Sequence, residues 1–130
     1  MSRTVKGLSA LTVALIAAGT LLTATPAQAG EYLSPCIGAV GSRYSPNGWL
    51  IPAKNFSYGS SGTCVKEIQF DIASTIGIDP ADWNNGAFVD GQWGPVTEKY
   101  VRRFQSQSGL DADGVVGPRT WESLVSRTTD

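Results

Sequence analysis

The sequence predicts an all-α fold, a compact three-helix bundle with repeated turn-helix units. The main observation is a repeat: the pattern D-G-x-x-G-P-x-T runs from Asp90 to Thr97 and again from Asp113 to Thr120. A second observation is the proline that begins the helical part of each copy. A third is that apolar residues recur at helical spacing before, between and after the two copies.

The repeated pattern has a direct structural meaning. Asp-Gly favours a tight turn, because glycine accepts a positive φ and aspartate accepts hydrogen bonds from nearby backbone N–H groups. Proline suits the first helical position, where its φ is already set and its missing N–H is not needed. Gly94 and Gly117, directly before the prolines, are also expected in the tight part of each turn. Valine at either position should therefore destabilise the fold by ~1–3 kcal/mol.

Three helices are expected in this part of the chain. They cover residues 63–74, 95–108 and, with a frayed end from 126 onward, 118–130. One face of each helix predicts the core: Val65, Ile68 and Ile72, then Thr97, Val101, Phe104 and Ser108, then Trp121, Leu124 and Val125. The first two helices are separated by a long connection at residues 78–89.

A loop-rich extension at residues 30–57 is expected before the helical domain at 58–130. Glycine and proline recur through this extension, and its aromatic and apolar residues follow no helical period. It is too apolar for a disordered linker. We therefore expect an ordered segment with a short hairpin around Asn47-Gly48.

Residues 1–29 are expected to be a secretory signal peptide. Arg3 and Lys6 precede an apolar run from Leu8 to Thr23, and Ala27-Gln28-Ala29 is a cleavage site of the A-x-A type before Gly30. The alternative is an uncleaved anchor, but the run is shorter than the roughly 20 residues that a membrane span needs. Cleavage would give a secreted monomer without membrane contact.

Two cysteines, Cys36 and Cys64, remain after cleavage. An exported chain with an even number of cysteines is expected to form a disulfide, which here would pin the extension onto the first helix. The loop closed between them corresponds to ~3–4 kcal/mol in the chain-entropy model. The alternative, two thiols kept for catalysis or metal binding, is disfavoured by the oxidising compartment.

Composition excludes several classes of function. Loss of Arg3 and Lys6 leaves 8 basic against 11 acidic residues, a net charge of −3, so nucleic-acid binding has no electrostatic basis. The chain has no histidine, which excludes Ser-His and Cys-His catalysis and histidine-bearing zinc sites. No cofactor is expected.

Carboxylate chemistry is also disfavoured. Asp90 and Asp113 are the best candidates for a glycosidase pair, yet each heads a turn in which its carboxylate would accept backbone N–H groups. The run that begins at Asp111 resembles the start of a calcium loop, but Val115 and Val116 stand where that loop needs a ligand and a glycine. We expect no catalytic residue and no metal site.

The order of motifs from Tyr58 to Leu124 carries a family resemblance. A glycine-rich turn at 59–62 precedes Val65, Ile68, Gln69 and Ile72; the first repeat precedes Val101, Phe104 and Gln105; and Gly109-Leu110, Asp113-Gly114, Gly117, Thr120-Trp121 and Leu124 close the pattern. In this order the chain resembles the peptidoglycan-binding domain family, a small three-helix module attached to many bacterial cell-wall hydrolases. The resemblance implies binding to glycan or stem peptide of the wall.

The resemblance also implies a groove among the turns before the second and third helices. Its polar contacts would come from Gln92, Asp113, Arg119 and Arg103, and its aromatic contact from Trp93. Other aromatic residues suited to sugar contact are Trp83, Trp49, Tyr58 and Tyr100, whereas Phe104 and Trp121 lie on core faces. Gln69 and Gln105 are expected to bond to a backbone loop rather than to a ligand.

Three functions remain open at this point. The first is a secreted non-catalytic peptidoglycan-binding protein. The second is a secreted protein-interaction or inhibitor module that reuses the same fold, with residues 30–57 as the partner surface. The third is a small hydrolase that uses carboxylates alone.

Overall fold

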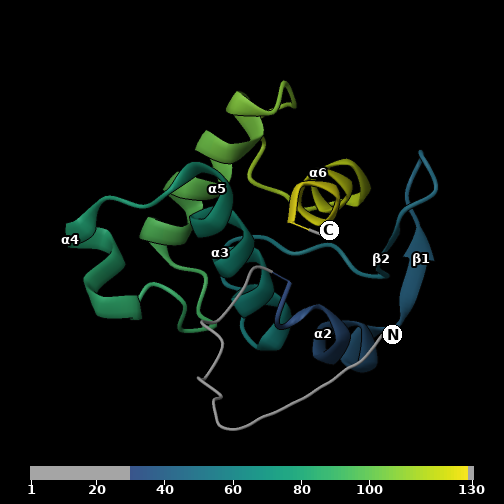
Figure 1. Ribbon diagram of the computed structural model, residues 1–130, viewed down its shortest axis with the longest axis horizontal. Helices are drawn as coiled ribbons and strands as arrows, with labels where there is room; N and C mark the ends of the chain where they lie inside the picture. Colours follow the sequence, from purple (N-terminus) through teal and green to yellow (C-terminus); the bar gives the residue numbers. More distant parts are fainter. Residues whose placement is uncertain (1–29, 129–130) are drawn as a thin grey trace, which may run out of the picture.

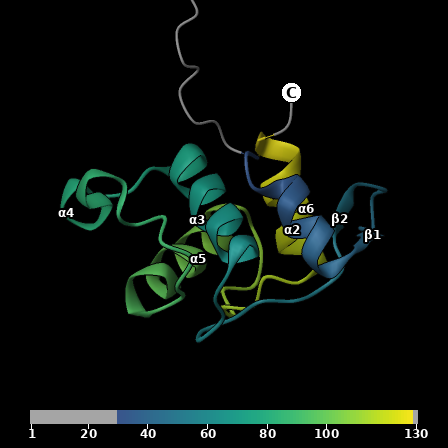
Figure 2. The same cartoon turned by 90° about the horizontal axis from the view of Figure 1, so that it is seen from below.

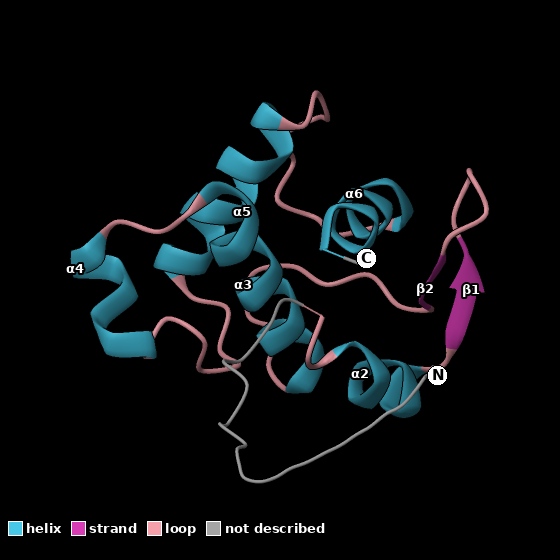
Figure 3. Ribbon diagram, viewed as in Figure 1, coloured by secondary structure: helices cyan, strands magenta, loops and turns pink. Residues whose placement is uncertain are grey.

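The computed structural model describes residues 30–128, so the predicted signal peptide at 1–29 lies outside the described residues. In the described range the chain forms five α-helices, a short 3-10 turn and one two-stranded sheet (Figures 1 and 3). The elements are α2 (Leu33–Val40), β1 (Ser42–Tyr44), β2 (Leu50–Pro52), α3 (Thr63–Ile76), α4 (Pro80–Trp83), η2 (Asn84–Gly86), α5 (Pro95–Gln107) and α6 (Pro118–Thr128).

Helices α3, α5 and α6 confirm the three predicted helices. α3 continues past Ser74 to Ile76 and ends before Gly77, whose φ of 77° lies in the left-handed region that glycine favours at helix ends. α6 runs on to Thr128, so residues 126–128 are helical rather than frayed as predicted, and residues 129–130 lie outside the described residues. Both α5 and α6 begin at proline, as the repeated pattern predicts.

The predicted helical content is confirmed, but the arrangement is more than three helices. α3 is the central element and packs against α2, α5 and α6. α2 lies between α3 and the hairpin formed by β1 and β2 (Figure 2). The buried core comprises Cys36, Ile51, Phe56, Cys64, Val65, Ile68, Ile72, Phe88, Trp93, Tyr100, Val101, Phe104, Val116, Trp121, Leu124 and Val125.

The N-terminal extension contains a helix that the sequence analysis did not predict. Leu33, Cys36 and Val40 are spaced at i, i+3 and i+7, and α2 places them against the core. Pro35 made this stretch look like a loop, but it lies in the first helical turn, where the backbone N–H has no intrahelical partner in any case. The predicted hairpin is confirmed: β1 and β2 are antiparallel, with Arg43 opposite Ile51.

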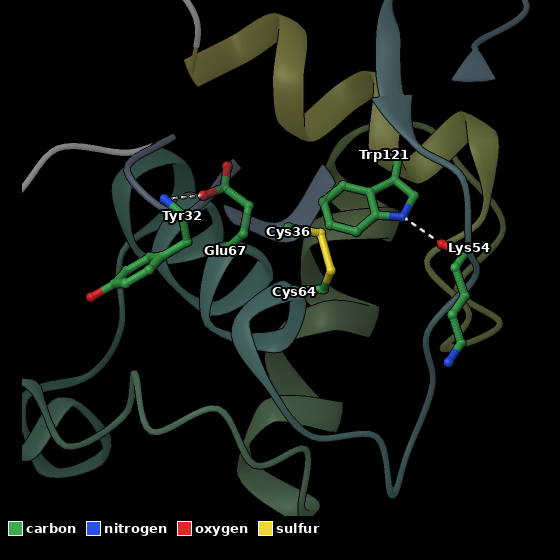
Figure 4. The surroundings of a disulfide bond; sticks show 6 residues. All are labelled: Tyr32, Cys36, Lys54, Cys64, Glu67 and Trp121. Carbon is green, nitrogen blue, oxygen red and sulfur yellow. Dashed lines mark hydrogen bonds between the residues drawn. A yellow bond between two sulfur atoms is a disulfide. The ribbon is translucent and has the colours of Figure 1, made fainter. Parts of the chain in front are cut away.

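The predicted disulfide between Cys36 and Cys64 is confirmed (Figure 4). Both cysteines are buried, and the bond joins α2 to the first turn of α3. A second contact holds the extension nearby. The indole N–H of Trp121 on α6 donates to the backbone oxygen of Lys54 over 3.0 Å. The extension is therefore fixed both to α3 and to α6.

The long connection between α3 and α5 folds back on α5. Phe88 packs edge-on against the ring of Tyr100 with centroids 5.6 Å apart. The Tyr100 hydroxyl donates to Asp82 Oδ2 over 2.7 Å and accepts from the backbone N–H of Asp79 over 3.1 Å. Within residues 30–128, no helix has the length and apolar character to cross a membrane.

Candidate functional site

The first repeated turn is held by the side chain of Gln69, which extends from α3 and is fully buried. Its Nε2 donates to Asp90 Oδ1 (3.1 Å), to the backbone oxygen of Gln92 (3.1 Å) and to Thr97 Oγ1 (3.0 Å). Its Oε1 accepts from the backbone N–H of Gly91 over 2.9 Å. One glutamine thus satisfies polar groups on both sides of the turn.

The second turn is held in the same way by Gln105 from α5. Its Nε2 donates to Asp113 Oδ1 (3.1 Å), to the backbone oxygen of Val115 (2.9 Å) and to Thr120 Oγ1 (3.1 Å). Its Oε1 accepts from the backbone N–H of Gly114 over 3.0 Å. The prediction that these glutamines bond to a backbone loop is confirmed.

The two aspartates take the role expected of them in the turns. Asp90 Oδ1 accepts from the backbone N–H of Gln92 over 2.8 Å, and Asp113 Oδ1 accepts from that of Val115 over 2.9 Å. One oxygen of each carboxylate is thus engaged within its own turn, and the two aspartates lie in separate turns. Among residues 30–128, no group of three or more Cys, Asp and Glu side chains is placed to hold a metal ion.

The strained positions in the turns are the first glycines of each copy. Gly91 and Gly114 have φ of 77° and 74°. The prediction that Gly94 occupies the tight position is wrong, because its φ is −109° and a Cβ there would meet nothing within 4 Å. A Cβ on Gly117 would make only ordinary contacts, at 3.6 Å from the Asn55 side chain.

A pocket lies at each turn. The second-turn pocket encloses about 570 Å³ and is lined by Pro46, Asn55, Gly109, Leu110, Asp111, Asp113, Val115, Gly117, Pro118, Arg119 and Thr120. The first-turn pocket encloses about 420 Å³ and is lined by Ala81, Asp82, Asn84, Ala87, Phe88, Asp90, Gln92, Gly94, Pro95, Val96 and Thr97. The same positions of the repeated pattern line both, so the repeat produces two related pockets.

The two pockets differ in charge. The second-turn pocket combines the cation of Arg119 with the carboxylates of Asp111 and Asp113. In the first-turn pocket, Val96 occupies the position of Arg119. Asp82 lines this pocket, but its carboxylate is engaged by the Tyr100 hydroxyl and by Lys99 Nζ at 2.9 Å, and these hydrogen bonds hold its pKa below the usual value. The second-turn pocket is therefore better suited to an anionic or mixed polar ligand.

The N-terminal extension completes the second-turn pocket. Pro46 from the hairpin loop and Asn55 line it, and Arg43 donates to Asn55 Oδ1 over 2.7 Å. Glu122 on α6 anchors the loop by accepting from Asn47 Nδ2 (2.6 Å), Asn47 N (3.0 Å) and Ser45 Oγ (2.6 Å). The side chains of Asn47 and Ser45 hold the pKa of Glu122 below its usual value. The Asn47-Gly48 turn was visible in the sequence, but its contact with α6 was not.

The structure separates the five residues predicted to bind the ligand. Asp113 and Arg119 line the second-turn pocket, whereas Gln92 lines the first. Arg103 lines neither, and its guanidinium lies over the Tyr100 ring, 4.8 Å from the centroid. Trp93 is only 3% exposed, and its indole N–H donates to Glu98 Oε1 over 2.8 Å. The ring of Trp93 thus presents no open face.

The other aromatic residues divide between core and surface. Phe104 and Trp121 lie in the core, as predicted. Tyr100 was expected among the sugar-contacting residues, but its side chain is fully buried and packs against Phe88, so that expectation is wrong. Trp49 and Tyr58 are exposed, at 38% and 59%. Trp83 is half-buried against Phe88.

Comparison with known proteins identifies the family. Residues 82–124, which hold both turns, α5 and most of α6, match the family model described as "Putative peptidoglycan binding domain". A protein of Kitasatospora aureofaciens, "Uncharacterized protein in bpoA1 3'region", is 34% identical over 91 residues, 67% of this chain and 72% of that protein. The chain belongs to the peptidoglycan-binding domain family.

Two enzymes are similar to this family member over part of their length. The zinc D-Ala-D-Ala carboxypeptidase of Streptomyces albus G is 36% identical over 94 residues, which cover 72% of this chain and 32% of that enzyme. A probable N-acetylmuramoyl-L-alanine amidase of Bacillus licheniformis is 41% identical over 82 residues, 60% of this chain and 23% of that protein. The chain spans about a third or less of the length of these two enzymes.

A solved structure also matches this family member. It is that of a peptidoglycan-binding protein from Clostridioides difficile in complex with glutamine hydroxamate. The match is 34% identical, covers 61% of this chain and 46% of that one, and has a TM-score of 0.48.

Proposed function

We propose that this chain is a secreted, non-catalytic peptidoglycan-binding protein and that its wall ligand occupies the second-turn pocket. The observation that carries the proposal is the pocket itself, which is built from the family-matched turn and contains Asp113 and Arg119. Its volume of about 570 Å³ is within the usual range for small-ligand sites, ~300–1,000 Å³. The first-turn pocket is smaller and has no lining cation.

We further propose that the stem peptide, rather than the glycan, is the group bound. No aromatic side chain lines the second-turn pocket, so it offers no ring on which a sugar could stack. It offers instead an arginine for a peptide carboxylate and two aspartates for amide or amino groups. Leu110, Val115 and Pro118 supply apolar contact for short aliphatic side chains.

Absence of catalysis is supported by composition and by the turns. The chain contains no histidine, and within residues 30–128 both cysteines are joined in the disulfide. The carboxylates of Asp90 and Asp113 stabilise their own turns. Secretion is supported by the A-x-A site at 27–29 and by the disulfide.

Sedimentation with insoluble peptidoglycan tests the proposal. We expect the protein to pellet with the wall, to release no soluble muropeptides, and to lose about tenfold or more in affinity in Arg119→Ala, as expected when a charged hydrogen-bonding partner is lost. Arg103→Ala is the matched control, because Arg103 is exposed but lines neither pocket. Equal losses of affinity in both variants would show that the ligand does not bind in the second-turn pocket. Muropeptide release that continues with time would show that the protein is an enzyme.

A second candidate function is a protein-interaction module, and one observation favours it. The hairpin exposes three apolar side chains, with Tyr44, Leu50 and Trp49 exposed by 75%, 45% and 38%. Apolar side chains grouped on a surface are typical of protein contacts. Under this alternative the wild-type protein would remain in the supernatant with every wall type tested at low salt.

A further inference from the structure

Two buried carboxyl groups lie outside both pockets, at the start of the described chain. Glu67 and Asp71 are one helical turn apart on α3, and both are fully buried. Glu67 Oε1 accepts from the backbone N–H of Tyr32 over 2.9 Å (Figure 4). Asp71 Oδ1 accepts from the backbone N–H of Gly30, also over 2.9 Å. Both side chains thus contact the segment that leads into α2.

Each of these groups has one oxygen without a hydrogen-bond donor. Glu67 Oε2 and Asp71 Oδ2 are buried and unpartnered among the described residues. Burial therefore raises the pKa of both carboxyls, that of Asp71 to about 10, and their proximity raises it further for Asp71. The two buried carboxyls therefore lack the donors that would stabilise their ionised forms.

No basic side chain among the described residues forms an ion pair with Glu67 or Asp71. α2 carries no charged residue, and nearby Glu31 is acidic and raises the pKa of Glu67 further. Lys66 lies over the ring of Tyr32. The charged side chains of α5 and α6 engage other groups or line the second-turn pocket: Glu98, Lys99, Arg102, Arg103, Arg119, Glu122 and Arg127.

Cleavage of the chain directly before Gly30 would create a cation at this place. Gly30 directly follows the predicted cleavage site Ala27-Gln28-Ala29. Hydrolysis of the Ala29–Gly30 bond by a signal peptidase consumes one water molecule, which adds OH to the Ala29 carbonyl carbon and H to the Gly30 nitrogen. The new amine then takes up a proton from solvent. The nitrogen that donates to Asp71 would become an ammonium group with three N–H donors and a positive charge.

We propose that Glu67 and Asp71 form a binding site for the α-ammonium group of the processed chain. The ammonium supplies positive charge beside two buried carboxyls that no basic side chain pairs with. Its additional donors match the oxygens that lack partners. Cleavage therefore stabilises the folded protein. The inference is independent of wall binding and rests on cleavage after Ala29.

Three forms of the chain test this site. One begins at Gly30 with a free amine, one retains Ala29 in front, and one begins at an acetylated Gly30. All three contain every described element of the fold. At pH 7 we expect the free form to have an unfolding equilibrium constant about tenfold or more below those of the other two, since loss of one partner of a buried charge pair is costly. Equal stability of the three forms would overturn the proposal.

The pH dependence gives a second readout. In the acetylated form the carboxyl pKa values are raised on folding, so the contribution of this pair to stability is highest in acid and falls as pH rises toward about 10. In the free form the ammonium offsets this decline until it loses its own proton. The ammonium should titrate above its usual value of roughly 8. An α-amine that titrates normally in the folded protein would contradict the inference.

Substitution of the Asp71 carboxyl distinguishes binding at this site from any other effect that a free N-terminus has on stability. In Asp71→Asn the stability difference between the free and Ala29-extended forms should shrink severalfold, while Glu31→Gln, which alters an exposed neighbour, should retain it. A full difference in Asp71→Asn would overturn the assignment. If Asp71→Asn does not fold, the comparison of the free and Ala29-extended forms still tests the proposal, because the extension changes no core residue.

Discussion

Gln69 and Gln105 make the same four hydrogen bonds in two different turns. The two glutamines are equivalent in their hydrogen-bond geometry but not in their sequence distance from the turn. The sequence separation between glutamine and aspartate is 21 for Gln69 and Asp90 but only 8 for Gln105 and Asp113. The longer segment in the first unit accommodates α4 and η2. The turn thus depends on the glutamine and on D-G-x-x-G-P-x-T, and tolerates a long insertion between them.

Replacement of one clamping glutamine should be costly. In Gln105→Leu, the backbone N–H of Gly114, the backbone oxygen of Val115 and the hydroxyl of Thr120 lose their partner. We expect about 2–4 kcal/mol of destabilisation, measured by urea unfolding. Gln107→Leu is the control, because Gln107 is exposed on the same helix. Equal midpoints for the two variants would refute the clamp.

The first glycine of each turn should be sensitive and the second tolerant. Gly114→Ala places a Cβ 2.5 Å from Glu98 Oε2 and 2.9 Å from Arg102 Nη2 at a φ of 74°. We expect Gly114→Ala to lower the free energy of unfolding by about 2 kcal/mol. Alanine is strained in left-handed backbone, and its Cβ would also displace the neighbouring ion pair. Gly94→Ala meets nothing within 4 Å at a φ of −109° and should change stability by less than about 1 kcal/mol. The ranking is checked by denaturant midpoints, and a reversed order would contradict it.

Loss of the disulfide should lower stability more than helicity. Cys36→Ser removes the bond between α2 and α3, which joins cysteines with a sequence separation of 28 and contributes ~3–4 kcal/mol in the chain-entropy model. α3, α5 and α6 keep their own buried faces, so far-ultraviolet circular dichroism at room temperature should stay near wild type while the Tm falls. An unchanged Tm, or complete loss of the helical signal, would contradict this account.

The hairpin should separate from α6 in acid. The pKa of Glu122 is lowered below its ordinary value of 4.5 by Asn47 and Ser45, so its contribution to stability is present above that value. The contribution is lost as pH falls through the lowered pKa. Chemical shifts of Asn47 and Trp49, followed by NMR below about pH 4.5, should report this separation. Glu122→Gln should remove the transition, and its persistence in that variant would assign it to another group.

The sequence predicted what depends on local chemistry. Proline at a helix start, glycine after aspartate and an apolar face every three to four residues are local signals, and α3, α5 and α6 follow them. α2 was missed because Pro35 and the glycines beside it suggested a loop, although proline is acceptable in a first turn.

The site was harder to predict because it depends on tertiary contacts. Arg103 and Arg119 are both exposed arginines on helices, and only the folded chain shows that the second lines a pocket. Trp93 matches an aromatic position of the pattern, but its indole is turned inward by Glu98. Pro46 reaches the pocket because the hairpin is fixed to α6 by Glu122, and Asn55 reaches it next to Phe56, which forms a bridge with Val116.

The central position of α3 has a consequence for sequence variation. Seven of its fourteen residues are buried, because this helix packs against α2, α5 and α6 at the same time. Those seven include a cysteine, two carboxyls and a clamping glutamine, each of which forms a disulfide or a hydrogen bond through its side chain. In a saturation mutagenesis experiment, residues 64–72 would be the least permissive window of the described chain. Library designs that target the proposed pocket should therefore vary its exposed residues Asp111, Val115 and Arg119 and leave α3 untouched.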